Sequence, residues 1–578
     1  MKKIFSILIS ICIFLSAAVT VSAKADTNAP YCNPDYIFSD CAKVIYDTLY
    51  DFNNYEENTE TIYPDDYFVY VDIRNRGVND ENLQSFIDSV FRQITEMFFI
   101  DGHSIGIRSS SNGVSALYFY TLYDLETTKA AVEKVDSVVN DIIKQASDIP
   151  TIQGKALFVH NYLALNNRYN SDILAGVPSS SVPYTVFNIY GALVDHNAVC
   201  QGYALAFNHI MRRMGCRADF VMSTALNHGW SLIEIDGLWY HVDVTWDDPT
   251  YDKCGNLDYE NFLLSDAGIK ATGHNSFDSF SQANATTTDY KIGDKYDTLY
   301  LHDKSKTKNN VVYNNGLWYF VRINGMGKYD ICTTEDIFAT SEELQYTVVK
   351  SISSLWYAQS GGFYPTISPS IFKYDDRLFY SVADAVYVCN FDMSNQSVVL
   401  KPEKPNNYTN LYGIFIDNDV LYYQMLDTPN CTQNEPLSSY QLKKADILFA
   451  TNSDLYLSDG VILGVKGEIT ARDLMFNAIN FKKVYFGDDI HGNGSCFVKN
   501  GDKLYVYGEG DTVSRGYTVI VSGDVNRDGK VNTFDIIRLK KLLNNGSVSS
   551  EDILYFDVDL NGELNESDLD LLVSLVTE

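Results

Sequence analysis

Three short segments between residues 197 and 246 contain a cysteine, a histidine and an aspartate that could act together. They read Asn197-Ala-Val-Cys200-Gln-Gly-Tyr203, Asn227-His228-Gly-Trp230 and Trp239-Tyr-His-Val-Asp243-Val-Thr-Trp246. A histidine can deprotonate a cysteine sulfur, and a carboxylate can orient the imidazole. The residue types therefore permit thiol chemistry, provided that the fold brings the three side chains together.

The cysteine lies at the start of a predicted helix, Cys200 to Met214, which Gly215 ends. Asn197 is a candidate cap for this helix. Unpaired backbone N–H groups and the helix dipole at such a position favour a thiolate over a thiol.

The sequence predicts two strands, 230–235 and 239–246, joined by Asp236-Gly237. The aspartate lies on the second strand, and the histidine lies two residues before the first. Asp-Gly between alternating strands is a strong hairpin signal. With these two residues as the turn, His228 faces Thr245, and Asp243 is its diagonal neighbour on the same face of the sheet. His241 shares that face but pairs further along, so His228 is the better base.

The ordered set of three motifs resembles the transglutaminase-like, papain-related superfamily, in particular its bacterial secreted branch. The resemblance covers about 100 residues and implies an α+β core. It also implies Cys200 as nucleophile, His228 as base and Asp243 as orienting carboxylate. The backbone N–H of Cys200 is a candidate oxyanion donor, with a second donor near Tyr190. The alternative is a buried, inert cysteine beside a structural His–Asp pair.

The C-terminal segment contains one pattern twice. Oxygen ligands fall at loop positions 1, 3, 5, 9 and 12, with glycine at position 6 and a backbone carbonyl expected at position 7. The predicted ligands are Asp524, Asn526, Asp528, Lys530, Asn532 and Asp535 in the first copy, and Asp557, Asp559, Asn561, Glu563, Asn565 and Asp568 in the second. We expect two Ca²⁺ ions, and helices 536–543 and 569–576 after the loops.

These loops resemble a dockerin: each has an exiting helix without an entering helix, Asp at position 12, and a tandem copy. An ordinary EF-hand pair is the alternative. The resemblance implies a cohesin domain of a scaffoldin as partner and a place in a cellulosome. Loop positions 10 and 11 help to choose the cohesin, and they differ between the copies, Thr533-Phe534 against Glu566-Ser567. One copy is therefore expected to dominate the contact.

The N-terminal residues indicate export, and the acidic net charge suits a protein outside the cell. Residues 1–25 have the pattern of a signal peptide, with Lys2 and Lys3 before an apolar run and small residues at its end. A membrane anchor is the alternative for this run, and no later stretch is long and apolar enough to span a bilayer. The net charge of −31 argues against nucleic acid as a partner, because phosphate binding needs a basic surface. We expect a secreted, extracellular protein.

The length of 578 residues exceeds one hydrophobic core. We expect a mixed α/β lead-in domain at 26–148, the transglutaminase-like domain at 149–288, a β-rich domain at 289–515 and a small all-α dockerin at 516–578. In the β-rich part, a strand–turn–strand phrase recurs at 311–320, 371–380, 414–423 and 496–506. Its spacing predicts a propeller-like fold, and a β-sandwich pair is the alternative.

The leading functional hypothesis is a scaffold-docked thiol acyl-transfer enzyme, a cysteine peptidase or amidase that acts on protein or peptide amides. Transfer of the acyl group to a lysine amine would instead give a cross-linking transglutaminase. A third hypothesis, from another class, is a non-catalytic binding protein with a vestigial triad.

Overall fold

The computed structural model describes residues 5–8, 38–57, 67–95, 97–110, 113–248, 255, 257–277, 290–365, 367–417, 419–429, 437–442, 455–458, 461–476, 483–486, 497–507, 515–544, 553, 555–559 and 563–577. Of the expected signal peptide, only strand β1 (Phe5–Leu8) falls within these residues. No helix of the described part is long and apolar enough to cross a membrane.

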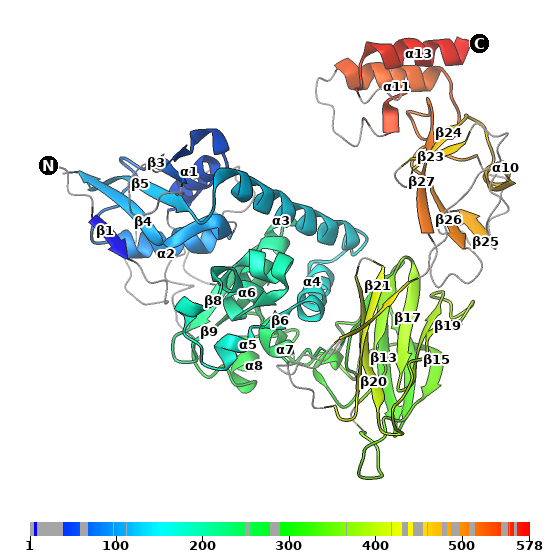
Figure 1. Cartoon of the computed structure of the whole chain (residues 1–578), viewed down its shortest axis with the longest axis horizontal. Helices are drawn as coiled ribbons and strands as arrows, with labels where there is room; N and C mark the ends of the chain where they lie inside the picture. Colours follow the sequence, from blue (N-terminus) through cyan, green and yellow to red (C-terminus); the bar gives the residue numbers. More distant parts are fainter. Residues whose placement is uncertain are drawn as a thin grey trace.

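The N-terminal part is a five-stranded antiparallel sheet with helices beside it (Figure 1). The strand order is β1-β4-β5-β3-β2, formed by β1, β4 (Ile100–Ser110), β5 (Gly113–Thr121), β3 (Tyr67–Asp72) and β2 (Glu56–Glu57). The helices are α1 (Ser39–Leu49), α2 (Leu83–Gln93) and α3 (Leu125–Gln145). From the sequence we expect strands at 68–73 and 117–122 and helices at 82–98 and 129–146, and β3, β5, α2 and α3 lie in these stretches with ends displaced by up to five residues.

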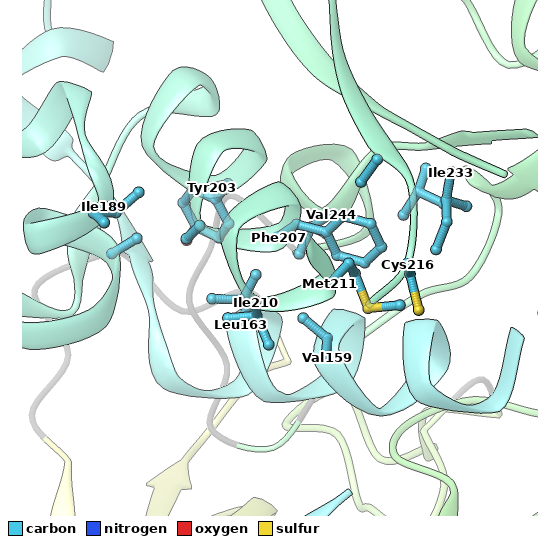
Figure 2. Packing of buried hydrophobic residues seen from close by; sticks show 14 of the residues in the cluster. Val159, Leu163, Ile189, Tyr203, Phe207, Ile210, Met211, Cys216, Ile233 and Val244 are labelled. Carbon is cyan, nitrogen blue, oxygen red and sulfur yellow. The ribbon is translucent and has the colours of Figure 1, made fainter. Parts of the chain in front are cut away.

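The central part packs helix α6 (Cys200–Arg213) between helix α4 (Ile152–Asn166) and a four-stranded sheet. Figure 2 shows apolar side chains of α6 directed at Val159 and Leu163 of α4 and at Ile233 of the sheet. Most of α6 is buried, and its large apolar side chains Tyr203, Phe207, Ile210 and Met211 recur at helical spacing. Gly215 follows the helix with φ of +80°, which fits its predicted role as the end signal.

The sheet has the order β11-β10-β9-β8, from β8 (Ala218–Ser223), β9 (His228–Ile235), β10 (Leu238–Val242) and β11 (Phe262–Leu264). The predicted hairpin register is confirmed, because Leu238 pairs with Ile235 and His241 with Leu232. The predicted length of the second strand is wrong. β10 ends at Val242, and the chain turns into the short helix α7 (Val244–Asp247).

The β-rich part consists of consecutive antiparallel meanders. The sheets are β12-β13-β14-β15, β16-β17-β18-β19 and β20-β21-β22. Their strands are β12 (Val312–Asn314), β13 (Leu317–Gly325), β14 (Lys328–Thr334), β15 (Thr347–Ser353), β16 (Ile371–Tyr374), β17 (Arg377–Val382), β18 (Ala385–Cys389), β19 (Ser397–Leu400), β20 (Asn410–Asp417), β21 (Val420–Leu426) and β22 (Ser438–Gln441).

The first three of the repeated phrases open one meander each, as hairpins β12–β13, β16–β17 and β20–β21. The fourth phrase is not a hairpin, because Phe497 forms a bridge with Thr470 and the chain then enters β26 (Lys503–Tyr507). The described residues form no closed propeller or barrel, so the propeller-like expectation for 289–515 is not met there.

The C-terminal part combines a five-stranded sheet and the short helix α10 (Ala471–Phe476) with two further helices, which Figure 1 draws in orange and red. The sheet order is β23-β24-β27-β26-β25, with β23 (Tyr456–Ser458), β24 (Val461–Val465), β25 (Lys483–Phe486) and β27 (Arg515–Val521). The helices α11 (Thr533–Asn544) and α13 (Glu566–Thr577) pack around Leu539, Leu569 and Leu572. Both begin three residues earlier than expected, because the last loop positions already belong to the first turn.

Candidate active site

Cys200 is the first residue of α6, as its sequence context predicts. It is half-buried, and the residue before it, Val199, is the N-cap without a side-chain hydrogen bond. The predicted cap is wrong: the Asn197 side chain instead accepts a hydrogen bond from Asn170 Nδ2 at 3.2 Å. No side chain therefore caps this end of the helix beside the thiol.

His228 and Asp243 form the pair that the hairpin register predicts. His228 Nε2 lies 2.6 Å from Asp243 Oδ2, and both side chains are buried. The other oxygen, Oδ1, accepts hydrogen bonds from the backbone N–H groups of Thr245 and Trp246 at 3.0 and 3.3 Å. Asp243 thus caps α7, which explains why β10 stops one residue before it.

The pair is an ion pair at neutral pH. Burial of the ring acts to lower the pKa of His228, but the carboxylate of Asp243 outweighs it and raises the pKa to about 10. Burial likewise acts to raise the pKa of Asp243, and the attraction of His228 holds it well below its usual range. The imidazole is therefore protonated and the carboxylate ionised across the neutral range.

Cys200 completes the set, because its side chain hydrogen-bonds to His228 and contributes to the raised pKa of that histidine. Since Nε2 of His228 faces Asp243, the nitrogen that remains for the thiol is Nδ1. The three side chains that the sequence singled out, Cys200, His228 and Asp243, are therefore in contact in series.

A fourth side chain, His274, was missed by the sequence reasoning. Its Nε2 lies 2.8 Å from Asp243 Oδ2, and its Nδ1 lies 3.2 Å from Thr272 Oγ1. The residue is fully buried. His274 follows Asp243 by 31 residues, so no local pattern connects the two.

Two tryptophans enclose the imidazole. Trp230 and Trp246 stack on His228 with ring centroids 5.6 and 5.3 Å away, and Trp246 is 42% exposed. His241 has a structural role, because its Nδ1 accepts the Trp230 indole N–H at 2.8 Å and its Nε2 contacts Asp266. This supports the choice of His228 over His241 as the base.

Tyr169 is a second residue that sequence reasoning missed. The short strands β6 (Arg168–Tyr169) and β7 (Asn197–Ala198) are parallel, and Tyr169 pairs with Ala198. The hydroxyl contacts both the backbone N–H and the side chain of Cys200, while burial raises the pKa of Tyr169. The Tyr190 N–H, expected near the oxyanion, instead donates to Asn188 Oδ1 at 2.9 Å.

The first C-terminal loop has the donor set that calcium prefers. Asp524 and Asp535 are fully buried, and each carboxylate accepts backbone N–H groups of the loop. Burial, with the charge of a neighbouring aspartate, raises the pKa of both groups. A hard cation would offset this repulsion, so the residues fit Ca²⁺. Asn526, Asp528, Lys530 and Asn532 lie on the same loop.

The second loop repeats the arrangement. Carboxylate oxygens of Asp557, Asp559 and Asp568 all lie within 4.8 Å of one another. Asp568 Oδ2 accepts the Asn565 N–H at 2.8 Å, as Asp535 Oδ2 accepts that of Asn532. Glu563 is exposed, and the expected ligand Asn561 lies outside the described residues. The cluster fits a second cation.

The comparison with protein families decides the identity of this module, since the dockerin type I domain matches residues 522–576. These residues form a dockerin type I domain. The resemblance read from the duplicated loops is thereby confirmed, and a dockerin indicates a cohesin as partner and a cellulosome-associated place. No curated protein matches the chain.

Three solved structures resemble part of the chain. They are a TGase, a candidate cysteine protease from Cytophaga hutchinsonii and a candidate protease from Parabacteroides distasonis, at 12, 14 and 12% identity. The matches cover 32, 25 and 23% of this chain and 52, 62 and 29% of those chains, with TM-scores of 0.18, 0.16 and 0.16. The chain therefore spans less than two thirds of each, and scores this low carry no argument about activity.

Proposed function

We propose that this protein is a thiol acyl-transfer enzyme, a cysteine peptidase or amidase that acts on protein or peptide amides. One observation carries the proposal: the buried ion pair of His228 and Asp243, 2.6 Å apart, contacts a cysteine at an uncapped helix N-terminus. An imidazolium and a helix N-terminus both favour the thiolate form of a neighbouring cysteine.

The residues can perform the reaction in two halves. In the first, the Cys200 sulfur attacks the amide carbonyl carbon, and the proton on His228 Nδ1 passes to the leaving nitrogen as the C–N bond breaks. The product is an acyl-thioester and a free amine. Asp243 remains ionised throughout and holds the ring so that Nδ1 faces the sulfur.

In the second half, the neutral His228 takes a proton from water, and the resulting hydroxide attacks the thioester carbonyl. The C–S bond breaks, the acid leaves and the thiolate–imidazolium pair is restored. A lysine amine in place of water would give cross-linking by the same steps. We favour hydrolysis, because the exposed Trp246 and the half-buried Cys200 leave the site open to water.

The dockerin would hold this enzyme on a scaffoldin outside the cell, with one Ca²⁺ in each loop. We further propose that the first copy dominates the cohesin contact. Phe534 and Ile537, one turn apart on α11, are 69 and 56% exposed. Leu571 and Leu575 on α13 are less exposed, at 37 and 44%. Exposed apolar side chains on a rigid helix are typical binding anchors.

Alkylation tests the thiol chemistry without knowledge of the substrate. Among the described thiols, Cys200 is half-buried while Cys41, Cys216, Cys332 and Cys389 are buried. Iodoacetamide at neutral pH should label Cys200 faster than these four thiols, and His228→Ala should abolish the difference. Peptide-library hydrolysis by the native protein, absent in Cys200→Ala, would identify the reaction.

Slow and unselective labelling of folded protein, together with no hydrolysis, would contradict the proposal and favour the vestigial triad. Circular dichroism of each variant distinguishes that outcome from unfolding. Incorporation of an amine into an acyl donor peptide, in place of hydrolysis, would identify a cross-linking enzyme instead.

A further inference from the structure

A cleft in the β-rich part, far along the chain from the triad, has the chemistry of a binding site. It has a volume of about 460 Å³ and lies between β15 on one side and β17 and β18 on the other. Figure 1 draws β15, β17 and β19 in the green to yellow part of the chain. Ligand pockets in proteins measure about 300–1,000 Å³.

Aromatic rings form two of the walls. Tyr380 and Tyr387 stack with centroids 5.1 Å apart and planes 12° apart, and both line the cleft. Tyr357 lines it from the loop after β15, and 49% of this tyrosine is exposed. Flat rings with a polar edge suit a ligand that has an apolar face and hydroxyl groups around it.

The exposed ring of Tyr357 is presented by a fixed backbone. Asn410, which is fully buried, accepts the Tyr357 N–H at Oδ1, at 3.3 Å. Its Nδ2 donates to the Tyr357 carbonyl at 2.9 Å. Both backbone groups of the tyrosine are thus held by one side chain. The backbone that carries the ring is therefore already ordered, and less chain freedom is lost when the ring contacts a ligand.

The cleft carries positive charge, although the whole chain has a net charge of −31. Lys350 Nζ donates to the neutral amide of Gln396 at 2.6 Å and lies 5.6 Å from the Tyr380 ring centroid. Lys404 Nζ donates to the neutral amide oxygen of Asn410 at 3.4 Å. The one carboxylate among the described lining residues, Asp384, lies 3.6 Å from Lys401. The two lysines therefore leave positive charge for a ligand.

We propose that this cleft binds an acidic oligosaccharide, a chain of sugar rings that carry carboxylates. The apolar face of a sugar ring would lie on the Tyr357 ring, and a carboxylate would accept charge-assisted hydrogen bonds from Lys350 and Lys404. Hydroxyl and amide groups of the lining would take up the sugar hydroxyls. The cleft would thus give the docked protein a contact with an acidic polysaccharide that is separate from the thiol site.

Calorimetry on the full-length protein tests the proposal, with oligogalacturonate as the ligand and an uncharged cello-oligosaccharide of the same length as its control. We expect binding of the acidic ligand alone, weakened by added salt. Tyr357→Ala and Lys350→Gln should each raise the Kd about tenfold or more. Tyr346→Ala and Lys328→Gln are matched controls, since both residues are exposed and lie outside the lining, and they should change the Kd less than about twofold.

Three outcomes would overturn the proposal: no binding of oligogalacturonate, equal binding of the uncharged oligosaccharide, or a Kd unchanged in both cleft variants. Binding of poly-glutamate in place of the sugar, with the same dependence on Tyr357 and Lys350, would identify an acidic-peptide site and overturn it as well. The Cys200→Ala variant should bind as the native protein does, so the result does not depend on the thiol chemistry.

Discussion

His274 shares one oxygen of Asp243 with the proposed base: its Nε2 lies 2.8 Å from Oδ2, and His228 Nε2 lies 2.6 Å from the same atom. With the two backbone N–H groups on Oδ1, the carboxylate accepts four hydrogen bonds. The hydrogen bond from His274 therefore holds Asp243 Oδ2 in place, and that oxygen in turn orients the His228 ring. It is a positioning residue, since it acts on the thiol through Asp243 and His228.

Replacement of His274 should separate its donor role from its packing. His274→Ala removes one hydrogen bond to a buried charge and should slow alkylation of Cys200 about tenfold or more. His274→Gln keeps an N–H donor and should stay within a few-fold of the native rate. The measurement is the iodoacetamide rate constant, with thermal unfolding alongside. Equal losses in both variants, matched by equal losses of stability, would show that the residue serves packing alone.

The pH dependence should report the ion pair. The pKa of His228 is raised from 6.5 to about 10, so the pair's stabilisation is fully present below 6.5 and is lost as the pH rises through about 10. The pKa of Asp243 is lowered from 3.8, so its share is present above 3.8 and is lost only as the pH falls below it. The His228 imidazole should therefore stay protonated through neutral pH and remain able to protonate the leaving amine during peptide hydrolysis.

Asp243→Asn removes the charge that raises the pKa of His228, so the basic limb of kcat/KM should move to lower pH in this variant. The pH profiles of the native and variant enzymes, measured on one peptide, check the shift. Glu234→Gln is a control carboxylate on the same sheet, paired with Arg217, and should leave the limb in place. A basic limb at the same pH in Asp243→Asn would refute the assignment.

The position of the thiol depends on a close approach at Gly202. A Cβ at this residue would lie 2.9 Å from Val186 O and 3.1 Å from Asn188 O, both backbone atoms. Gly202→Ala should therefore displace the first turn of α6, with Cys200, and destabilise the protein by about 1–3 kcal/mol. Alkylation should slow about tenfold or more, while Gln201→Ala, in the same turn, should not. A native alkylation rate in Gly202→Ala would show that the turn tolerates the methyl group.

The sequence predicted the part of the site that local rules determine. A two-residue Asp-Gly turn leaves one register for the hairpin, and that register brings His228 to Asp243. The end of β10 was not predictable from alternation, because it depends on the Asp243 side chain bonding the next N–H groups. His274 and Tyr169 reach the site from other elements, and only the tertiary fold brings them there.

In the β-rich part too, local sequence determines the hairpins, while the arrangement of the sheets depends on the tertiary fold. Polar turns between alternating strands predicted three hairpins, and each is present. Closure into a propeller depends on how whole sheets pack, and the spacing of turns does not determine it. The fourth phrase, at 496–506, has similar turn residues, but the backbone of Phe497 pairs with Thr470 and not with β26.

Removal of calcium should loosen the dockerin. Without a cation, the buried carboxylates of Asp524 and Asp535 repel each other, and the loop loses the ion that joins its oxygens. EGTA should abolish cohesin binding and speed proteolysis within 522–576, and calcium should restore both. Asp535→Ala and Asp568→Ala should each remove one ion from the calorimetric stoichiometry. The same proteolytic pattern with and without calcium would refute this role of the loops.

The cohesin contact should depend most on α11. Phe534 is 69% exposed at the start of that helix. Phe534→Ala should weaken cohesin binding about thirtyfold or more, because an aromatic anchor contributes about 2 kcal/mol or more to an interface. Ser567→Ala changes the matching position of the second copy and should weaken binding less than about threefold. Calorimetry with a cohesin in excess calcium gives both values. A larger loss of binding in the α13 variant than in the α11 variant would assign the contact to α13. Equal losses would show that both copies bind, and the difference between the residue pairs 533–534 and 566–567 argues against that outcome.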